Sequence, residues 1–242
     1  MCYNISYLEA RAERVKKHYG VQHKLPLLIE NVYHISGFAH PQVPVITSEE
    51  PHLLQAMQWG LIPNWCKDEE QAMQIRDQTL NAKSETIFEK PSFRAVARKR
   101  CLIVVTGFYE WHTLNKHKYP FYIHLKNREF FSLGGIYDTW LNKNTGEVIN
   151  SFAIITVAAN PLMAQIHNTM KRMPFIVPIA KEQEWLQSDL SKDDIKAMML
   201  SYNEQEMEAH TISKRITDRS QSNNTPEVME PAIYPELAMF GW

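Results

Sequence analysis

Short apolar segments with β-strand character fill the middle of this 242-residue chain, and they constrain its fold more than any other feature. Turn residues such as Pro, Asn and Gly separate them. The segment CLIVVTGFYEWH is too apolar to face solvent on both sides. The predicted strands lie in VYHISGF (32–38), VPVIT (43–47), LLQAMQWGLI (53–62), CLIVVTGFYEWH (101–112), KYPFYIHL (118–125), EFFSLGGIYDTW (129–140) and VINSFAIITVAA (148–159).

Helical patterns lie mainly at the two ends of the chain. Residues 8–18 read as a helix that Gly20 stops, with basic side chains in its last turn where they suit the helix dipole. Further helices are expected at 181–187 and 192–201, and two short ones within 84–100, broken at Pro91. HTISKRI (210–216) should be extended, and 218–227 an exposed loop. With no internal repeat and no earlier linker, we expect one α+β domain over 1–242.

Composition bounds the class of protein. A hydrophobic content of 44% and a charged content of 22% fit an ordinary globular chain, and no apolar run is long enough for a signal peptide or a membrane span. The spacing of Cys2, Cys66 and Cys101 matches no zinc site or disulfide framework, and Cys101 is expected in the core. We therefore expect a cytoplasmic protein without metal or cofactor, favoured to be a monomer. A net charge of −1 means that any nucleic-acid binding needs local basic patches.

Cys2 stands directly behind the initiator methionine. If Met1 is removed, Cys2 carries a thiol and a free α-amine on neighbouring carbons. Their reference pKa values, about 8.5 and about 7.7 to 8.0, leave both partly available at neutral pH. Together they favour aldehydes, because the amine forms an imine and the thiol can close on it to give a thiazolidine.

Four other stretches stand out, each with a structural alternative. TLNAKSETI (79–87) is either a binding loop or an Asn turn followed by an N-cap. Glu110 in GFYEWH is either an acid/base group or half of a structural ion pair. His167 in IHNTMKRMP is either functional or a satisfied structural histidine. The tryptophans of WGLIPNW (59–65) either stack on unpaired bases or belong to the core.

Taken together and in their order along the chain, these motifs resemble those of the SRAP family, the SOS-response-associated peptidase-like proteins that recognise abasic sites in single-stranded DNA. Its members read close to WGLIP-x-W, NAR-x-E, GFYEW and IH-x-RMP, and the resemblance extends from Cys2 to about Pro178. It implies a mainly antiparallel β-barrel-like core with peripheral helices, a basic groove for single-stranded DNA, and Met1 removal.

The family's active-site set falls on Cys2, Asn81, Glu110 and His167. The resemblance assigns covalent capture of the ring-opened abasic aldehyde to Cys2 and positioning of the reactive end to Asn81. Glu110 would shuttle protons, and His167 would assist opening of the deoxyribose. Lyase and self-processing peptidase activities are also implied. The DNA-binding residues would be Trp59, Pro63, Trp65, Lys83, Arg94, Thr156 and Arg172.

The chain also departs from the family pattern. Tyr3 and Asn4 replace the usual Gly and Arg after the cysteine, and Lys83 replaces an Arg, which keeps the charge but loses bidentate geometry. Four residues, in place of one, separate His167 from Arg172. These departures bear on DNA affinity more than on reaction type.

Two other function classes remain open. An N-terminal-nucleophile amidohydrolase, such as a glutamine amidotransferase, also uses a cysteine at this position with its own α-amine as the base. It gives no reason for WGLIPNW or GFYEW. A non-catalytic module could bind single-stranded DNA through Trp59, Trp65 and the basic stretch 83–100, and would not need Cys2.

Overall fold

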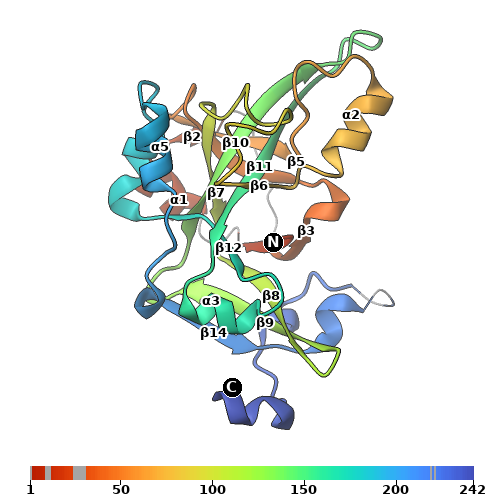
Figure 1. Cartoon of the computed structure of the whole chain (residues 1–242), viewed down its shortest axis with the longest axis vertical. Coiled ribbons are helices and arrows are strands. Elements are labelled where there is room, and N and C mark those ends of the chain that lie inside the picture. Colours follow the sequence, from red (N-terminus) through yellow and green to blue (C-terminus); the bar gives the residue numbers. More distant parts are fainter. Residues whose placement is uncertain (1, 9–11, 24–30, 219, 221) are drawn as a thin grey trace.

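The computed structural model describes residues 2–8, 12–23, 31–218, 220 and 222–242. Two β-sheets form the body of the molecule, and helices lie at its margins (Figure 1). The α+β class expected from the sequence is confirmed. None of the described helices has the length and apolar character that a membrane crossing requires.

Five strands close into a barrel. They follow one another in the order β11, β10, β7, β4 and β5, and β5 pairs again with β11. Four of the pairs are antiparallel and β5–β11 is parallel, because an odd number of strands cannot alternate direction all the way round a closed ring. The predicted barrel-like, mainly antiparallel core is thereby confirmed. The bounds are β4 (Gln42–Thr47), β5 (Leu53–Trp59), β7 (Arg100–Val105), β10 (Phe131–Leu141) and β11 (Val148–Ala158).

Four short strands attach to the barrel strands. One of them, β6, is parallel to β11, whereas β12 is antiparallel to the same strand. This arrangement places the segment after β6 and the start of β12 near one stretch of β11. The bounds are β2 (Gln22–His23), β6 (Asn81–Lys83), β12 (Arg172–Pro174) and β13 (Ile176–Val177).

The second sheet has the order β14, β9, β8, β1 and β3. The predicted strand CLIVVTGFYEWH supplies both sheets, because it ends as β7 at Val105 and resumes as β8 at Gly107. A Cβ on Gly107 would lie 2.4 Å from the Tyr122 ring, so a larger residue does not fit here. The bounds are β1 (Asn4–Tyr7), β3 (Val32–Ser36), β8 (Gly107–Leu114), β9 (His117–Leu125) and β14 (Met207–Thr211).

The described α-helices are short: α1 (Ala12–Tyr19), α2 (Glu69–Arg76), α3 (Pro161–Ile166), α4 (Glu182–Trp185) and α5 (Lys192–Met198). Helix α1 confirms its prediction from residue 12 on, and residues 9–11 of that prediction lie outside the described residues. The predictions behind α4 and α5 were correct in place but too long. The described 3₁₀-helices are η2 (Gly37–Ala39), η3 (Ile179–Lys181), η4 (Glu204–Glu206), η5 (Lys214–Thr217), η6 (Pro226–Met229) and η7 (Pro235–Phe240).

Helices α2 and α3 were missed by the sequence reading. Each begins at a side-chain cap that satisfies a free backbone N–H, Asp68 for α2 and Asn160 for α3. Their apolar stripes cover only two turns, too few to show a helical period. The caps were therefore the only strong local signal for either helix.

The two helices predicted within 84–100 are wrong, because residues 84–98 form turns. Most of the backbone bonds there join residues three apart, for example Thr86 to Lys83 and Phe93 to Lys90. Pro91 has no N–H to donate, and each piece is too short to repay helix nucleation. The extended prediction for 210–216 is correct to Ser213, since β14 ends at Thr211, Ile212 forms an isolated antiparallel bridge with Pro231 and Ser213 is extended, and it is wrong from Lys214, where η5 begins.

Candidate functional site

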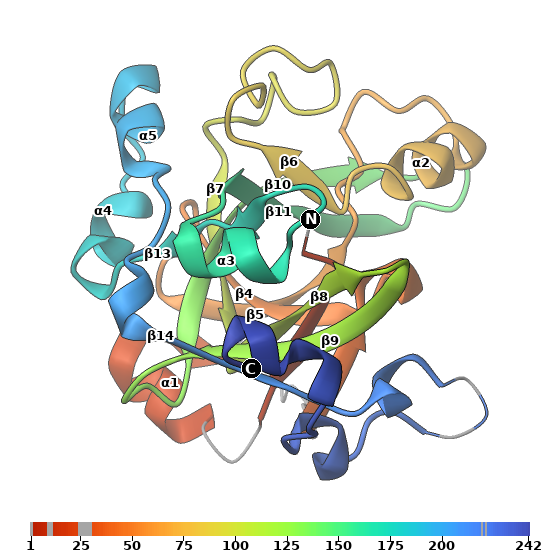
Figure 2. The ribbon, with the colours of Figure 1, turned by 60° about the horizontal axis from the view of Figure 1, so that its bottom comes forward.

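Cys2 lies just before β1, where the N-terminal segment passes close to α3 and β6 (Figure 2). It has no exposed surface. Burial raises the pKa of its thiol far above the ordinary value, and the negative charge of Glu110 raises it further. In this state the thiol is protonated at neutral pH, whereas the reference value had suggested partial ionisation. Met1 lies outside the described residues, so its predicted removal stays a prediction.

Asn81 ties the barrel to the Cys2 backbone. As the first residue of β6 it is held in register opposite Ile154 of β11. Its amide Nδ2 donates a hydrogen bond of 2.9 Å to the carbonyl oxygen of Cys2. Its Oδ1 is buried and has no hydrogen-bond partner among the described residues. A buried acceptor of this kind is suited to a donor group on a bound molecule.

Glu110 lies on β8, which pairs with β1. The pairs Ile5–Phe108 and Ser6–Gly107 fix an antiparallel register, and continuing it by two residues sets Glu110 opposite Tyr3, next to Cys2. Glu110 is only 4% exposed. Burial raises the pKa of its carboxyl group from 4.5 to about 7. The group can therefore both donate and accept a proton near neutral pH.

His167 caps the end of α3, and its ring is held by the backbone that follows. Nδ1 lies 2.9 Å from the carbonyl oxygen of Arg172. Because a carbonyl only accepts, Nδ1 carries the hydrogen, and Nε2 is the nitrogen able to take up a proton. Burial lowers the pKa of the imidazole, which favours the neutral ring. Nδ1 also lies 3.8 Å from Glu110 Oε1.

The structure thus brings together the four residues that the sequence nominated as catalytic. They come from the segment just before β1, from β6, from β8 and from the end of α3, which are far apart in sequence. The arrangement contains a nucleophile, an amide anchor, a carboxyl group near its titration midpoint and a neutral imidazole. This set can capture an electrophile and move protons around it, without a metal.

Three of the seven predicted DNA-binding residues are buried. Trp59 stacks on Phe152, with ring centroids 6.2 Å apart, and its ring N–H donates to the Leu80 carbonyl. In this conformation the ring belongs to the core and is not available to a base, as one of the two sequence readings held. Pro63 and Thr156 are buried as well.

The other four reach the surface to different degrees. Trp65 is 42% exposed, and Lys83 and Arg94 are exposed. The guanidinium of Arg172 is largely covered and forms a two-point ion pair with Glu85. A phosphate at Arg172 would have to share this group with a carboxylate that is already in place.

One aromatic pair beside the cysteine was not foreseen from the sequence. Tyr3 and Phe38 lie with ring centroids 4.9 Å apart, and Phe38, on the short turn after β3, is 64% exposed. The backbone N–H of Gly37 donates to the Tyr3 carbonyl, which fixes the turn against the N-terminal strand. No local pattern could reveal the pair, because its partners are 35 positions apart and meet only through the β1–β3 pairing.

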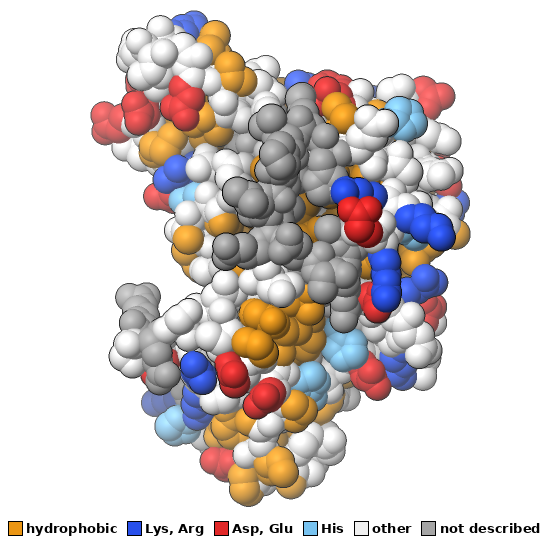
Figure 3. All heavy atoms as spheres, turned by 180° about the vertical axis from the view of Figure 1, so that it is seen from behind, with side chains coloured by type: hydrophobic (Ala, Val, Ile, Leu, Met, Phe, Trp, Pro, Cys, Tyr) orange, Lys and Arg blue, Asp and Glu red, His pale blue; other side chains and the backbone are white. Residues whose placement is uncertain are grey.

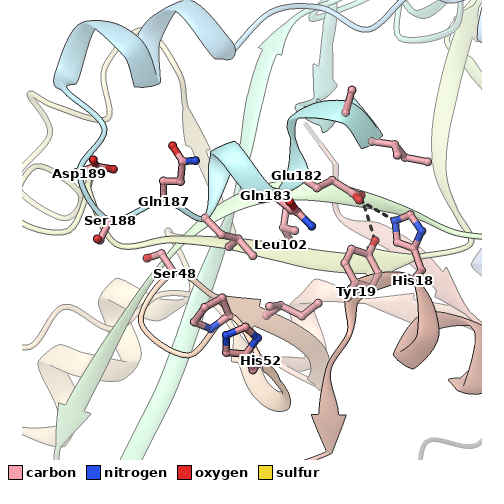
Figure 4. A pocket seen from close by; sticks show the side chains of 15 residues that line it. His18, Tyr19, Ser48, His52, Leu102, Glu182, Gln183, Gln187, Ser188 and Asp189 are labelled. Carbon is pink, nitrogen blue, oxygen red and sulfur yellow. Dashed lines mark hydrogen bonds and ion pairs between the residues drawn. The ribbon is translucent and has the colours of Figure 1, made fainter.

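A large cavity lies away from these residues, between α1, the β4–β5 turn and α4 (Figure 4). It has a volume of about 880 Å³. At one end the buried carboxylate of Glu182 accepts bonds from His18 at 2.8 Å and Tyr19 at 3.2 Å. None of the residues nominated from the sequence lines this cavity.

The face opposite the view of Figure 1 is mixed in charge. On its described part, Asp and Glu side chains lie among Lys and Arg side chains (Figure 3). Such a mixture offers a polyanion little net attraction. Among the described residues, no three His, Cys, Asp or Glu side chains gather as a metal site would require.

Comparison with known proteins agrees with the motifs. The chain matches the family described as SOS response associated peptidase (SRAP) over residues 1–219. It is 37% identical over 209 residues to the abasic site processing protein YoqW of Bacillus subtilis, covering 84% of this chain and 89% of that protein. The abasic site processing protein HMCES of Xenopus tropicalis is 30% identical over 202 residues, covering 75% of this chain and 58% of that protein.

Solved structures agree as well. A crystal structure of a protein from Bacteroides thetaiotaomicron is 38% identical, with a TM-score of 0.89 over 96% of this chain and all of that one. A second, from Bordetella bronchiseptica, shares the fold with a TM-score of 0.74 at 22% identity, over 88% of this chain and all of that one. The resemblance drawn from the sequence motifs is confirmed, and the chain belongs to the SRAP family.

Proposed function

We propose that this chain processes abasic sites in single-stranded DNA by forming a covalent thiazolidine through Cys2 after Met1 has been removed. The observation that carries the proposal is the convergence of Cys2, Asn81, Glu110 and His167 in one buried site. The names of the relatives, abasic site processing proteins, supply the substrate class.

The chemistry balances without any other reactant. The α-amine of Cys2 adds to the C1′ aldehyde of the ring-opened deoxyribose, and the adduct loses one water to give an imine. The thiol sulfur then bonds to the imine carbon, and the thiol proton ends on the nitrogen. The product is a five-membered ring, and the only substance released is water.

The protons have defined carriers in this proposal. Glu110, with a pKa of about 7, donates a proton to the departing hydroxyl and later accepts the proton of the Cys2 thiol. A nearby acceptor is needed because the buried thiol is protonated at neutral pH. His167, through Nε2, would exchange a proton with the sugar oxygen during ring opening. Asn81 would hold the cysteine backbone and use Oδ1 to orient a sugar hydroxyl.

The DNA strand would be bound by phosphate contacts to Lys83 and Arg94 and by stacking on exposed aromatic rings. Trp65 and the Tyr3–Phe38 pair are available for stacking in this conformation. The pair lies beside Cys2, so a base next to the abasic sugar could rest on it. This arrangement favours single strands, since the faces of a base inside a duplex are covered by the neighbouring base pairs.

Denaturing gels and intact mass spectrometry test the proposal. Processed protein and an oligonucleotide with one abasic site should give a heat-stable adduct whose mass is the sum of the two minus one water. Cys2→Ala should give none. Cys2→Ser keeps the amine and should give only a short-lived imine that borohydride traps, with some strand cleavage by β-elimination. A protein that retains Met1 should give neither, and a durable adduct from it would rule out the N-terminal mechanism.

The alternatives predict other outcomes. An amidohydrolase would release ammonia from glutamine or a related amide and would ignore the abasic site. A pure binding module would keep its DNA affinity and lose nothing in Cys2→Ala. Lyase activity would appear as strand cleavage by the processed protein, and self-processing as loss of Met1 that Cys2→Ala abolishes when the purified precursor is incubated alone.

A further inference from the structure

Glu85, which no reading of the sequence gave a role, makes the most specific polar contact near the candidate site. It lies two residues after the end of β6, and its two carboxylate oxygens bind the two terminal nitrogens of Arg172, one of them at 3.0 Å. The exposed Glu85 side chain thereby reaches an Arg172 side chain that is only 12% exposed. Bidentate pairs of this kind fix both partners in orientation as well as in distance.

Arg172 is also bound to the strand that lies between the two partners. Its Nη2 donates to the carbonyl oxygen of Thr156 and to the Thr156 hydroxyl at 3.2 Å. The same Thr156 carbonyl accepts the backbone N–H of Ser84 at 3.0 Å. Hydrogen bonds among Glu85, Arg172 and Thr156 therefore connect the end of β6 with β11 and β12, and we call these three residues the clamp.

One residue of the clamp, Arg172, also contacts the imidazole of His167. The Arg172 carbonyl oxygen is the group that accepts the Nδ1–H of His167 at 2.9 Å. Lys171, between them, has a left-handed φ of +49°, and its N–H returns to the His167 carbonyl at 2.8 Å. The backbone of the long NTMK spacer is thus folded back so that Arg172 still reaches His167. A shift of the Arg172 backbone would move the carbonyl that accepts this ring N–H.

We propose that Glu85 is a positioning residue, which acts through Arg172 to fix the tautomer and orientation of His167. The opposite end of the same spacer is fixed independently, since Asn168 exchanges two hydrogen bonds with Thr113 of β8, at 2.8 and 3.0 Å. The proposal rests on the function proposed above for its effect on crosslinking. Its effect on the ring itself does not depend on that function.

The test compares Glu85→Gln with Glu89→Gln, which removes an equal charge four residues further along the same exposed segment. Titration of the His167 ring followed by NMR in the free protein is the first measurement. Burial now lowers the pKa of this imidazole, so a loosened ring should titrate at higher pH in Glu85→Gln and not in Glu89→Gln. The crosslinking rate should fall about tenfold in Glu85→Gln only, and its pH profile should move the same way.

Arg172→Lys separates positioning from DNA contact. Lysine keeps the charge but cannot form the bidentate pair with Glu85. A positioning role therefore predicts that Arg172→Lys crosslinks as slowly as Glu85→Gln and binds intact single-stranded DNA with unchanged affinity. In a protein that carries both Glu85→Gln and Arg172→Lys, the two losses of crosslinking rate should not add, because both substitutions remove the same ion pair. An unchanged His167 titration in Glu85→Gln, or a loss confined to DNA affinity, would overturn the proposal. Failure of the wild type to crosslink would remove the proposed function and leave the titration result standing.

Discussion

Two carboxyl groups of this protein, those of Glu110 and Glu182, are equally buried but differ in the groups that contact them. Each is 4% exposed, and each has a histidine nearby. The Glu182 carboxylate is bound by His18 at 2.8 Å and by the Tyr19 hydroxyl at 3.2 Å (Figure 4). At Glu110 the neighbouring imidazole nitrogen is 3.8 Å away and gives its hydrogen to the Arg172 carbonyl.

The comparison shows that burial alone does not identify an acid/base group. Glu182 joins α4 to α1, because its carboxylate accepts hydrogen bonds from His18 and Tyr19 of α1. Desolvation dominates at Glu110 and raises its pKa to about 7, which suits proton transfer. The cavity of about 880 Å³ lies beside Glu182, so cavity volume does not lead to the four residues nominated from the sequence.

The largest expected effect is on reaction rate at Glu110. Glu110→Gln keeps the shape of the side chain and removes proton exchange, so crosslinking to abasic DNA should slow by roughly 100-fold or more. Single-turnover gels measure the rate, and binding to intact single-stranded DNA serves as the control. If the variant crosslinks at the wild-type rate, Glu110 is as structural as Glu182.

The converse substitution should change stability and leave the rate alone. Glu182→Ala leaves His18 and Tyr19 without their shared acceptor, and we expect the free energy of unfolding to fall by about 1–3 kcal/mol. Urea midpoints measure it. If Glu182→Ala crosslinked more slowly than the wild type at a temperature where the variant is fully folded, the Glu182 region would be coupled to the Glu110 region.

The pH dependence of stability sharpens the same contrast. Below pH 4.5 the Glu110 carboxyl is protonated whether the chain is folded or unfolded, so it carries no penalty. Between pH 4.5 and about 7 the unfolded chain ionises first, which favours unfolding, and the penalty levels off above that range. Glu110→Gln should therefore be more stable than the wild type at pH 8, by at most about 3 kcal/mol, and similar to it at pH 4. Equal stability at both pH values would mean that Glu110 is not desolvated.

The smallest expected effect is on DNA binding outside both regions. Lys83→Gln and Arg94→Gln should each weaken binding to intact and abasic strands alike and lower the salt slope by about 0.7. Lys118→Gln, an exposed change on β9 of the other sheet, is the matched control. If all three variants lost the same DNA affinity, the DNA would not bind specifically at Lys83 and Arg94.

Most of the strands could be predicted from the sequence because the apolar and β-branched residues that favour a strand are consecutive in the chain. Apolar runs such as CLIVV and FAIITV predicted strands that the structure contains, and Pro and Asn-Gly turns marked their ends. The short helices α2 and α3, the turns at 84–98 and the passage of one predicted strand into two sheets were missed or misread. The passage between the two sheets is set by contacts with a distant segment, since the Thr106 N–H donates to the Ser6 carbonyl. The short helices and the turns extend over too few residues for a periodic pattern to show.

The sequence by itself determined which residues were chemically able to act. It singled out Cys2, Asn81, Glu110 and His167, and its motifs indicated the family to which the chain belongs. Side-chain identity and local order are properties of the chain alone, so they could be read without a fold.

Only the tertiary structure decided what surrounds those side chains. It buried Trp59 and exposed Phe38, raised the pKa of Glu110, and set the two ends of the Glu85–Arg172 pair together from positions 87 apart. Desolvation and ion pairing depend on atoms within a few ångströms, whichever part of the chain supplies them. For that reason the sequence could nominate Glu110, but only the tertiary structure shows how its surroundings differ from those of Glu182.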